Sequence, residues 1–147
     1  MARWLIPLII LLVIFVTFAT YQWVIPRADL EVRSVYHESP GGGGTGGAIN
    51  YNVLITNWGN RRVEDLNCAV RIFNSSGGEV AMDSITDVSL YRRDNVEMAL
   101  HFVGDQFSDF EIRIHLFFDC KGNSYVEDLD YYTKEDQMNI VFVDHIG

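Results

Sequence analysis

The chain has 147 residues, of which 20 are acidic and 11 are basic, so its formal net charge is −9 at pH 7. All 20 acidic side chains and nine of the 11 basic ones lie after residue 28, which gives residues 28–147 a net charge of −11. Such a surface repels nucleic acid and anionic lipid headgroups. About 120 residues of this composition are enough for one domain with a two-layer core.

The first element is an uncharged, apolar run from Trp4 to Val24. At about 1.5 Å of rise per residue, a helix of this length spans roughly 30 Å, the hydrocarbon thickness of a bilayer. Trp4 and Trp23 suit the two membrane interfaces, and Pro26 ends the helix near the second one. A cleaved signal peptide, with Thr17-Phe18-Ala19 as its cleavage site, is the alternative interpretation.

We therefore expect residues 1–27 to form a single-pass anchor in the cell membrane, or an uncleaved signal sequence, and residues 28–147 to form a second unit. The charges that flank the apolar run, Arg3 on one side and Arg27 and Arg33 on the other, are nearly balanced. The acidic composition, the sequon-like Asn74-Ser75-Ser76 and two cysteines without metal-site spacing favour an extracytoplasmic location for residues 28–147.

After residue 28 the chain alternates apolar and polar residues in short runs that are bounded by turn sequences. The fourth run loses its period near Ile85, which suggests a bulge. No 3.6-residue pattern follows residue 28, so two sheets must cover each other. The predicted strands lie around residues 30–36, 49–55, 66–72, 79–90, 96–102, 110–120, 125–131 and 140–142.

A glycine-rich segment connects the first two predicted strands. Gly41, Gly43 and Gly46 satisfy the G-x-G-x-x-G spacing of dinucleotide-binding proteins, but that fingerprint must be followed by a helix. A strand pattern follows instead, from Ile49 onward. We interpret residues 41–47 as a loop and exclude a nucleotide site.

Turn sequences within this pattern carry a family resemblance. The sequence VLITNWGN at 53–60 contains an N-x-G-N-like turn and precedes Val63 and AVRIFNSSGGEV at 69–80, while FFDCKGN at 117–123 is similar to a second such hairpin. The pattern resembles the CARDB-type and FxLYD-type Ig-like domains of prokaryotic, especially archaeal, cell-surface proteins. The resemblance covers residues 49–125 and implies a fold without catalytic residues. We expect an all-β fold, an Ig-like antiparallel β-sandwich of about 7–8 strands, preceded by one N-terminal transmembrane helix.

Cys68 and Cys120 both fall on inward positions near one end of the predicted sandwich. A disulfide between them would close a loop of about 52 residues and stabilise the fold by roughly 4 kcal/mol. Two separate buried thiols are the alternative, and neither cysteine has histidines at zinc spacing. In the neighbouring turn, Asn74 is the candidate for glycosylation.

Two arginine pairs, Arg61-Arg62 and Arg92-Arg93, lie in predicted turns of an otherwise acidic domain. They either balance neighbouring carboxylates or dock an acidic protein or the carboxylates of a polysaccharide, since guanidinium groups match carboxylates geometrically. Trp58 and an exposed tyrosine such as Tyr91 would extend a contact patch. These residues are the candidates for partner contact.

The motifs of the common enzyme classes are absent from the sequence, including H-E-x-x-H, G-x-S-x-G and a P-loop lysine. The acidic groups follow no EF-hand spacing, so we interpret them as solvated side chains, with an incidental Ca²⁺ as the alternative. We expect no catalytic residue, no metal and no cofactor. The residues considered for these roles are His37, His101, His115, His145, Asp83, Asp87, Asp105, Asp109, Glu127, Asp128 and Asp130.

Together these features predict a non-enzymatic, membrane-anchored extracytoplasmic module for protein–protein or cell-envelope interaction. Its expected partners are the membrane and a protein or envelope component, without nucleic acid. One alternative is a filament subunit that resembles type IV pilins or archaellum stator proteins, which also join an N-terminal apolar helix to a β-sandwich. A saccharide or small-ligand binding module is another.

Overall fold

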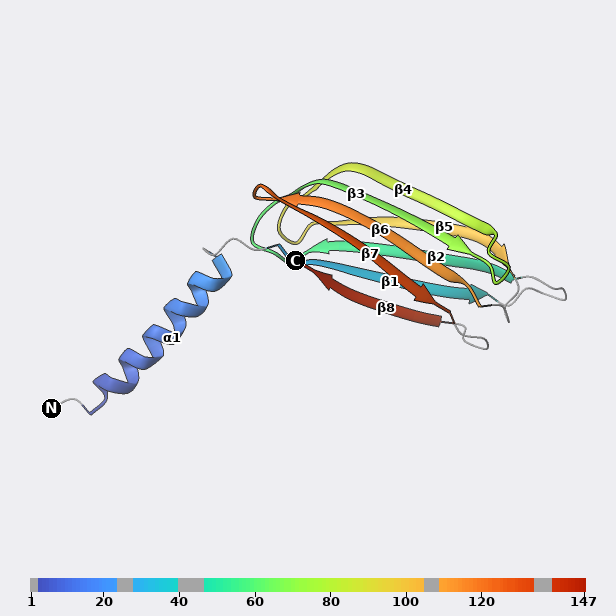
Figure 1. Cartoon of the computed structure of the whole chain (residues 1–147). Helices are drawn as coiled ribbons and strands as arrows, with labels where there is room; N and C mark the ends of the chain where they lie inside the picture. The colour runs from blue at the N-terminus through green and yellow to red at the C-terminus, as the bar shows by residue number, and fades with distance from the viewer. Residues whose placement is uncertain (1–2, 24–27, 40–46, 105–108, 134–138) are drawn as a thin grey trace.

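The computed structural model describes residues 3–23, 28–39, 47–104, 109–133 and 139–147. The glycine-rich residues 41–46 and Asp105 lie outside the described residues. The described residues form one helix followed by eight strands, and the strands are arranged as two layers at one end of the helix (Figure 1).

Helix α1, Leu5–Trp23, has no buried residue and is long and apolar enough to cross a membrane. Its 19 residues span about 28 Å at 1.5 Å per residue. The hydroxyl groups of Thr17 and Thr20 donate to the backbone carbonyls of Val13 and Val16, each at 2.7 Å, so they are satisfied within the helix. Such internal pairing is what a hydrocarbon environment demands of polar groups.

The two layers are antiparallel sheets of four strands each. Sheet A has the order β5-β2-β1-β8, with β1 at Leu30–Ser39, β2 at Gly47–Asn57, β5 at Asn95–Gly104 and β8 at Asn139–Ile146. Sheet B has the order β4-β3-β6-β7, with β3 at Val63–Phe73, β4 at Glu79–Leu90, β6 at Glu111–Cys120 and β7 at Asn123–Tyr132. The expected all-β, Ig-like sandwich after one N-terminal helix is confirmed.

Alternate residues of each strand fill the space between the sheets, as the period-two pattern predicts. The core includes Leu30 and Val32 of β1 and Ile112, Ile114 and Leu116 of β6, all at most 1% exposed. Aromatic pairs extend it at the β7 side. Phe118 stacks on Tyr125 with ring centroids 4.8 Å apart, and Tyr131 of sheet B stacks on Phe142 of sheet A at 4.4 Å.

The register between β3 and β4 shifts at three places, one of them between the pairs Ile72–Ala81 and Phe73–Glu79 at the far end of the ladder. Another shift lies between the pairs Leu66–Val88 and Cys68–Ile85, so β4 has one extra residue there, and Asp87 has a positive φ of 54°. This confirms the broken period near Ile85. The third shift lies between the pairs Val63–Leu90 and Leu66–Val88, where β3 has the extra residue and Asp65 has a φ of 50°. The sequence did not predict this bulge.

The hydroxyl groups of Ser34 and Tyr51 lie in the core. Ser34 and Tyr51 are both 0% exposed, and among the described residues neither hydroxyl meets a partner with hydrogen-bond geometry. Burial raises the pKa of Tyr51 well above its usual value, although the nearby Ser34 hydroxyl opposes the shift. Folding therefore removes water from the Tyr51 hydroxyl without providing a hydrogen bond of equal strength.

We predict that Tyr51→Phe leaves the free energy of unfolding unchanged or raises it by about 1 kcal/mol, because the ring stays and an unpaired hydroxyl is removed. Tyr51→Ala removes the ring from a filled core and should cost about 3–5 kcal/mol. Urea unfolding of both variants in detergent, followed by near-UV circular dichroism, measures the two effects. A destabilisation by Tyr51→Phe of more than about 1 kcal/mol would show that the hydroxyl is well paired.

Candidate functional site

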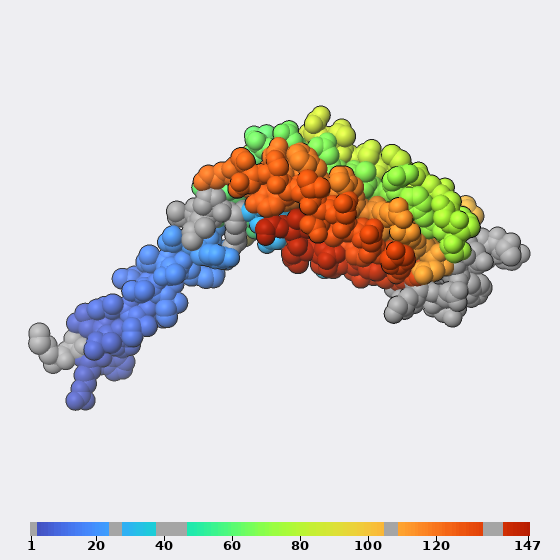
Figure 2. Space-filling model, in the orientation of Figure 1, coloured from blue at the N-terminus to red at the C-terminus, as the bar shows by residue number. Residues whose placement is uncertain are grey.

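One end of the sandwich collects the segments that lie closest to α1. The register pairs Leu30 with Asn57 and with Ile146, so β1 begins where β2 and β8 end. In sheet B, Val63 pairs with Leu90 and with Cys120, so β3 begins where β4 and β6 end. Helix α1 approaches this same end (Figures 1 and 2). We call the loops 58–62, 91–94 and 121–122 at this end the proximal rim.

The proximal rim contains all five residues that the sequence suggested for partner contact: Trp58, Arg61, Arg62, Arg92 and Arg93. The sequence separates the two arginine pairs by about 30 positions, and pairing of the strands brings their loops to one end. Tyr91 lies there as well, and it is 59% exposed, against 44% for Trp58.

Lys121 is a rim residue that the sequence interpretation missed. Lys121 and Gly122 have φ values of 47° and 78°, the two consecutive positive values of a type I′ hairpin turn. The turn joins β6 to β7, and Val63 pairs with the preceding Cys120, so Lys121 must lie beside the 58–62 loop. The sequence predicted the hairpin turn at 121–123, but its place beside the 58–62 loop depends on the pairing of β3 with β6.

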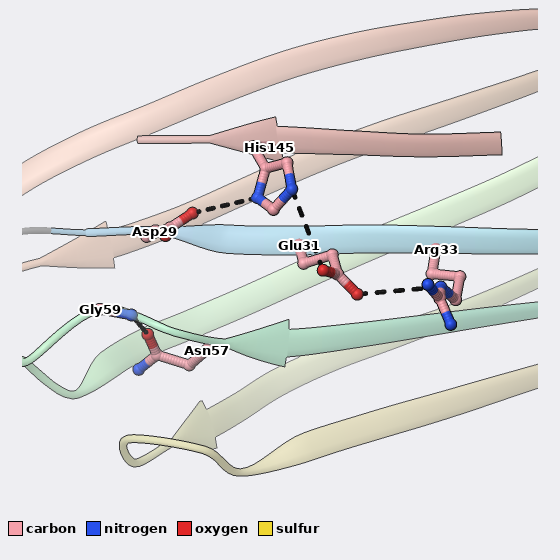
Figure 3. A network of polar contacts seen from close by, with 6 residues as sticks. All are labelled: Asp29, Glu31, Arg33, Asn57, Gly59 and His145. Carbon is pink, nitrogen blue, oxygen red and sulfur yellow. Dashed lines mark hydrogen bonds and ion pairs between the residues drawn. The ribbon is translucent and has the colours of Figure 1, made fainter.

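Asn57, at the end of β2, holds two of the rim loops together. Its side chain is 0% exposed and donates to the carbonyl oxygens of Arg61 at 2.8 Å and Leu90 at 3.0 Å. It also accepts from the Gly59 amide at 2.9 Å (Figure 3). Its backbone accepts from the Arg93 amide at 2.7 Å. One amide side chain thus satisfies buried backbone groups of the 58–62 loop and of the end of β4.

We predict that Asn57→Ala lowers the free energy of unfolding by about 2–4 kcal/mol, because it leaves two carbonyls and one amide without a hydrogen-bond partner. Asn52→Ala, the same change on the same strand at a half-buried outward position, should stay within about 0.5 kcal/mol of the parent. Urea unfolding of the three proteins compares them. Equal stabilities of the two variants would contradict the structural role of Asn57.

The rim is also joined to both sides of the α1 junction. The guanidinium carbon of Arg92 lies 4.2 Å from the centroid of the Trp23 ring, at the end of α1. Asn60 donates to the backbone carbonyl of Gln22 at 3.4 Å, and the Trp58 amide donates to the carbonyl of Asp29 at 2.8 Å. These contacts place the rim against the last turn of the helix.

A row of charged side chains crosses sheet A near the rim. His145 lies 3.4 Å from Asp29 and 3.9 Å from Glu31, and Arg33 lies 3.9 Å from Glu31 (Figure 3). The His145 and Arg33 side chains are 59% and 55% exposed. Exposed pairs at such distances contribute little to stability, and the row is a solvated surface rather than a binding site.

The outer face of sheet B carries a second group of charges around Phe73. The guanidinium carbons of Arg71 and Arg113 lie 5.3 Å and 4.8 Å from the Phe73 ring centroid. Each arginine also binds a carboxylate, Arg71 to Glu79 and Arg113 to Glu111. The Arg113 guanidinium holds the pKa of Glu111 below its usual value, and Glu111 raises the pKa of Arg113. These cations are neutralised locally, in contrast to the rim.

Other expected residues are dispersed. Among the described residues, no group of three His, Cys, Asp or Glu side chains could hold a metal ion. His115 lies 2.6 Å from Asp128 on sheet B, whereas His101 contacts Asn50 on sheet A. The acidic groups of β4 and β7 lie on separate edge strands, so they do not converge.

Asn74 lies in the turn between β3 and β4, at the end of the sandwich opposite to the rim. Its side-chain oxygen accepts from the Ser76 hydroxyl at 2.7 Å and from the Gly78 amide at 2.8 Å, which shapes the turn. Glycosylation of Asn74 stays a prediction.

The two cysteines are separate, buried thiols, so the disulfide alternative is not the one that the structure adopts. Cys68 pairs with Leu116 and Cys120 with Val63, which puts the cysteines four residues apart along neighbouring strands. That offset is about 13 Å, far beyond the Cα separation that a disulfide bridges. Burial raises the pKa of Cys68 to about 12 and also raises the pKa of Cys120.

We predict that N-ethylmaleimide modifies neither thiol rapidly in the folded protein at pH 8, since the reactive thiolate forms only near the raised pKa values. In denaturant without reductant, both cysteines should react, and intact mass should show two added groups. An unreactive denatured protein would show that a disulfide forms after all.

Because the pKa of Cys68 is raised on folding, the stabilisation that its thiol provides is complete below about pH 9 and declines from there toward pH 12.

Comparison with known proteins supports the fold alone. No protein-family model matches the chain, and no curated protein gives a significant match. A crystal structure of a Bordetella pertussis protein assigned as ApaA is similar with a TM-score of 0.57 and 13% identity, over 77% of this chain and 98% of that one. An Archaeoglobus fulgidus protein has a TM-score of 0.43 and 9% identity, over 77% and 97% of the two chains. The CARDB-type and FxLYD-type resemblance stays a prediction.

Proposed function

We propose that this protein is a non-enzymatic module that α1 anchors in the cell membrane, with its Ig-like sandwich on the extracytoplasmic side, and that the sandwich contacts a protein or an envelope component. The length and lipid-like surface of α1 support the anchor. The acidic charge and the sequon-like Asn74-Ser75-Ser76 support the location. The exposed apolar edge strand β8 supports a binding role.

The main support for the proposed contact is the exposed edge of strand β8. Among the described strands it pairs with β1 alone, so its other edge presents free backbone donors and acceptors. Val141 and Val143 on its outward side are 57% and 44% exposed, and Val141 pairs with the half-buried Val35. An exposed, apolar edge strand is the usual template for addition of a strand from another chain.

The partner is therefore expected to meet the protein at β8 and the adjoining outer face of sheet A. The rim faces the end of the molecule that receives α1, since Arg92 contacts Trp23, so it is less accessible to a partner beside the sandwich. The outer face of sheet B presents arginines that are already paired with carboxylates. Within the described part of the chain, strand β8 combines an unpaired backbone edge with two exposed valines on one face, Val141 and Val143.

We predict that a photo-crosslinking amino acid at Val141 of the full-length protein captures a partner in the membrane fraction of cells that make it. The matched control is Met82, an equally exposed apolar residue, at 58%, on the edge strand β4 of the other sheet. Adducts from Met82 alone, or from neither position, would contradict a contact at β8.

Intact mass of the same membrane fraction tests the anchor separately. A complete chain fits the proposal, while cleavage after Ala19 would remove the anchor, and loss of only a few leading residues would favour the filament subunit. Recovery of the complete chain in the soluble fraction would overturn the proposal.

A further inference from the structure

The proximal rim concentrates positive charge in an acidic domain. In residues 28–147 the structure describes eight basic side chains, and five of them lie in the rim loops, where Asp94 is the one acidic side chain. The domain as a whole has a net charge of −11. Opposite charges are thus separated along the sandwich, with the positive end next to α1. The five basic rim residues are Arg61, Arg62, Arg92, Arg93 and Lys121.

Several of these cations are available for a further ligand. Arg61, Arg93 and Lys121 are exposed and make no ion pair within the described part of the chain. Arg62 contacts Glu64 at 3.5 Å, with side chains 45% and 54% exposed, and its guanidinium lies 5.0 Å from the Tyr91 ring centroid. Unlike Arg71 and Arg113 on sheet B, most of the rim arginines are not neutralised by a carboxylate.

Backbone strain also favours a role for this loop. Arg93 has a φ of 67° in a turn in which the Asp94 amide donates to the Tyr91 carbonyl at 3.0 Å. Glycine or asparagine is the usual residue at a turn position with positive φ, because a Cβ atom crowds the backbone there and only glycine lacks one, while asparagine offsets the cost by local hydrogen bonds. An arginine at this position exposes its charge at the tip of the loop.

The position of the rim identifies its ligand. Helix α1 ends at Trp23, and only residues 24–27 separate it from Ala28, a span of at most about 17 Å. A tryptophan at the end of a transmembrane helix lies at the level of the lipid headgroups. Since Arg92 contacts the Trp23 ring, the rim lies at that level too.

We propose that the proximal rim binds the anionic headgroups of the leaflet where α1 ends. Arg61, Arg93 and Lys121 contact lipid phosphates, and Trp58 and Tyr91 lie among the headgroups, as exposed aromatic residues do at membrane interfaces. The acidic remainder of the sandwich is repelled by the same surface. Attraction of the basic rim and repulsion of the acidic remainder together orient the sandwich, with the rim at the bilayer surface and the opposite end away from it.

This inference rests on the proposed membrane anchor, and its test uses the full-length protein. Trp4→Phe and Trp23→Phe leave Trp58 as the sole tryptophan, because the chain contains three. The protein is reconstituted into vesicles of phosphatidylcholine, with or without phosphatidylglycerol, that contain a lipid with a spin-labelled headgroup. Vesicle flotation reports insertion of α1, and quenching of Trp58 fluorescence reports contact of the rim with headgroups.

We predict that phosphatidylglycerol increases the quenching of Trp58 by about twofold or more at low salt, and that high salt removes the increase. Arg61→Gln with Arg93→Gln should reduce quenching to the level of phosphatidylcholine alone. Arg71→Gln with Arg113→Gln removes the same charge from sheet B and should leave it unchanged. Far-UV circular dichroism verifies that each double variant is folded.

Each result decides one statement. A protein that does not float with the vesicles contradicts the proposed anchor. A protein that floats but shows equal quenching in both lipids, or equal loss in both double variants, overturns the headgroup site.

Discussion

The buried amide of Asn57 is the interaction on which the proximal rim depends. It lies where β2 leaves sheet A for sheet B, and it satisfies the carbonyls of Arg61 and Leu90 and the amide of Gly59. Its backbone also pairs with the 91–94 loop, so a single residue joins the two loops that carry the arginine pairs. Without it, the four arginines would lie on independent loops with no defined common surface.

Because these loops are held in place, charge and position act together at one end of the molecule. The same end receives α1, whose Trp23 ring lies against Arg92. The arginines near Phe73 show the contrast, since each has a carboxylate beside it and is neutral in effect. The domain is therefore acidic as a whole while the surface nearest the helix is basic, which composition alone hides.

Much of the fold follows from local sequence signals, and the site does not. Alternation at period two predicted the eight strands, because burial of one face imposes that period on every strand. The bulge near Ile85 was visible as a lost period, but the one at Asp65 was not, since polar residues surround it. The grouping of Arg61 with Arg93, and the separation of Cys68 from Cys120, depend on strand register. Register is set by pairing between distant segments, and no local pattern in one sequence encodes it.

The ladder between β1 and β8 has a mechanical consequence. Strand β1 continues directly from the segment that follows α1, and eight residue pairs, from Leu30–Ile146 to His37–Asn139, join it to β8. A pull on β8 away from α1 would reach the helix through this ladder along the strand axis. Its hydrogen bonds lie across that axis, so they would share the load in shear rather than open one after another. The sandwich can therefore transmit tension from the edge strand β8 through β1 to α1.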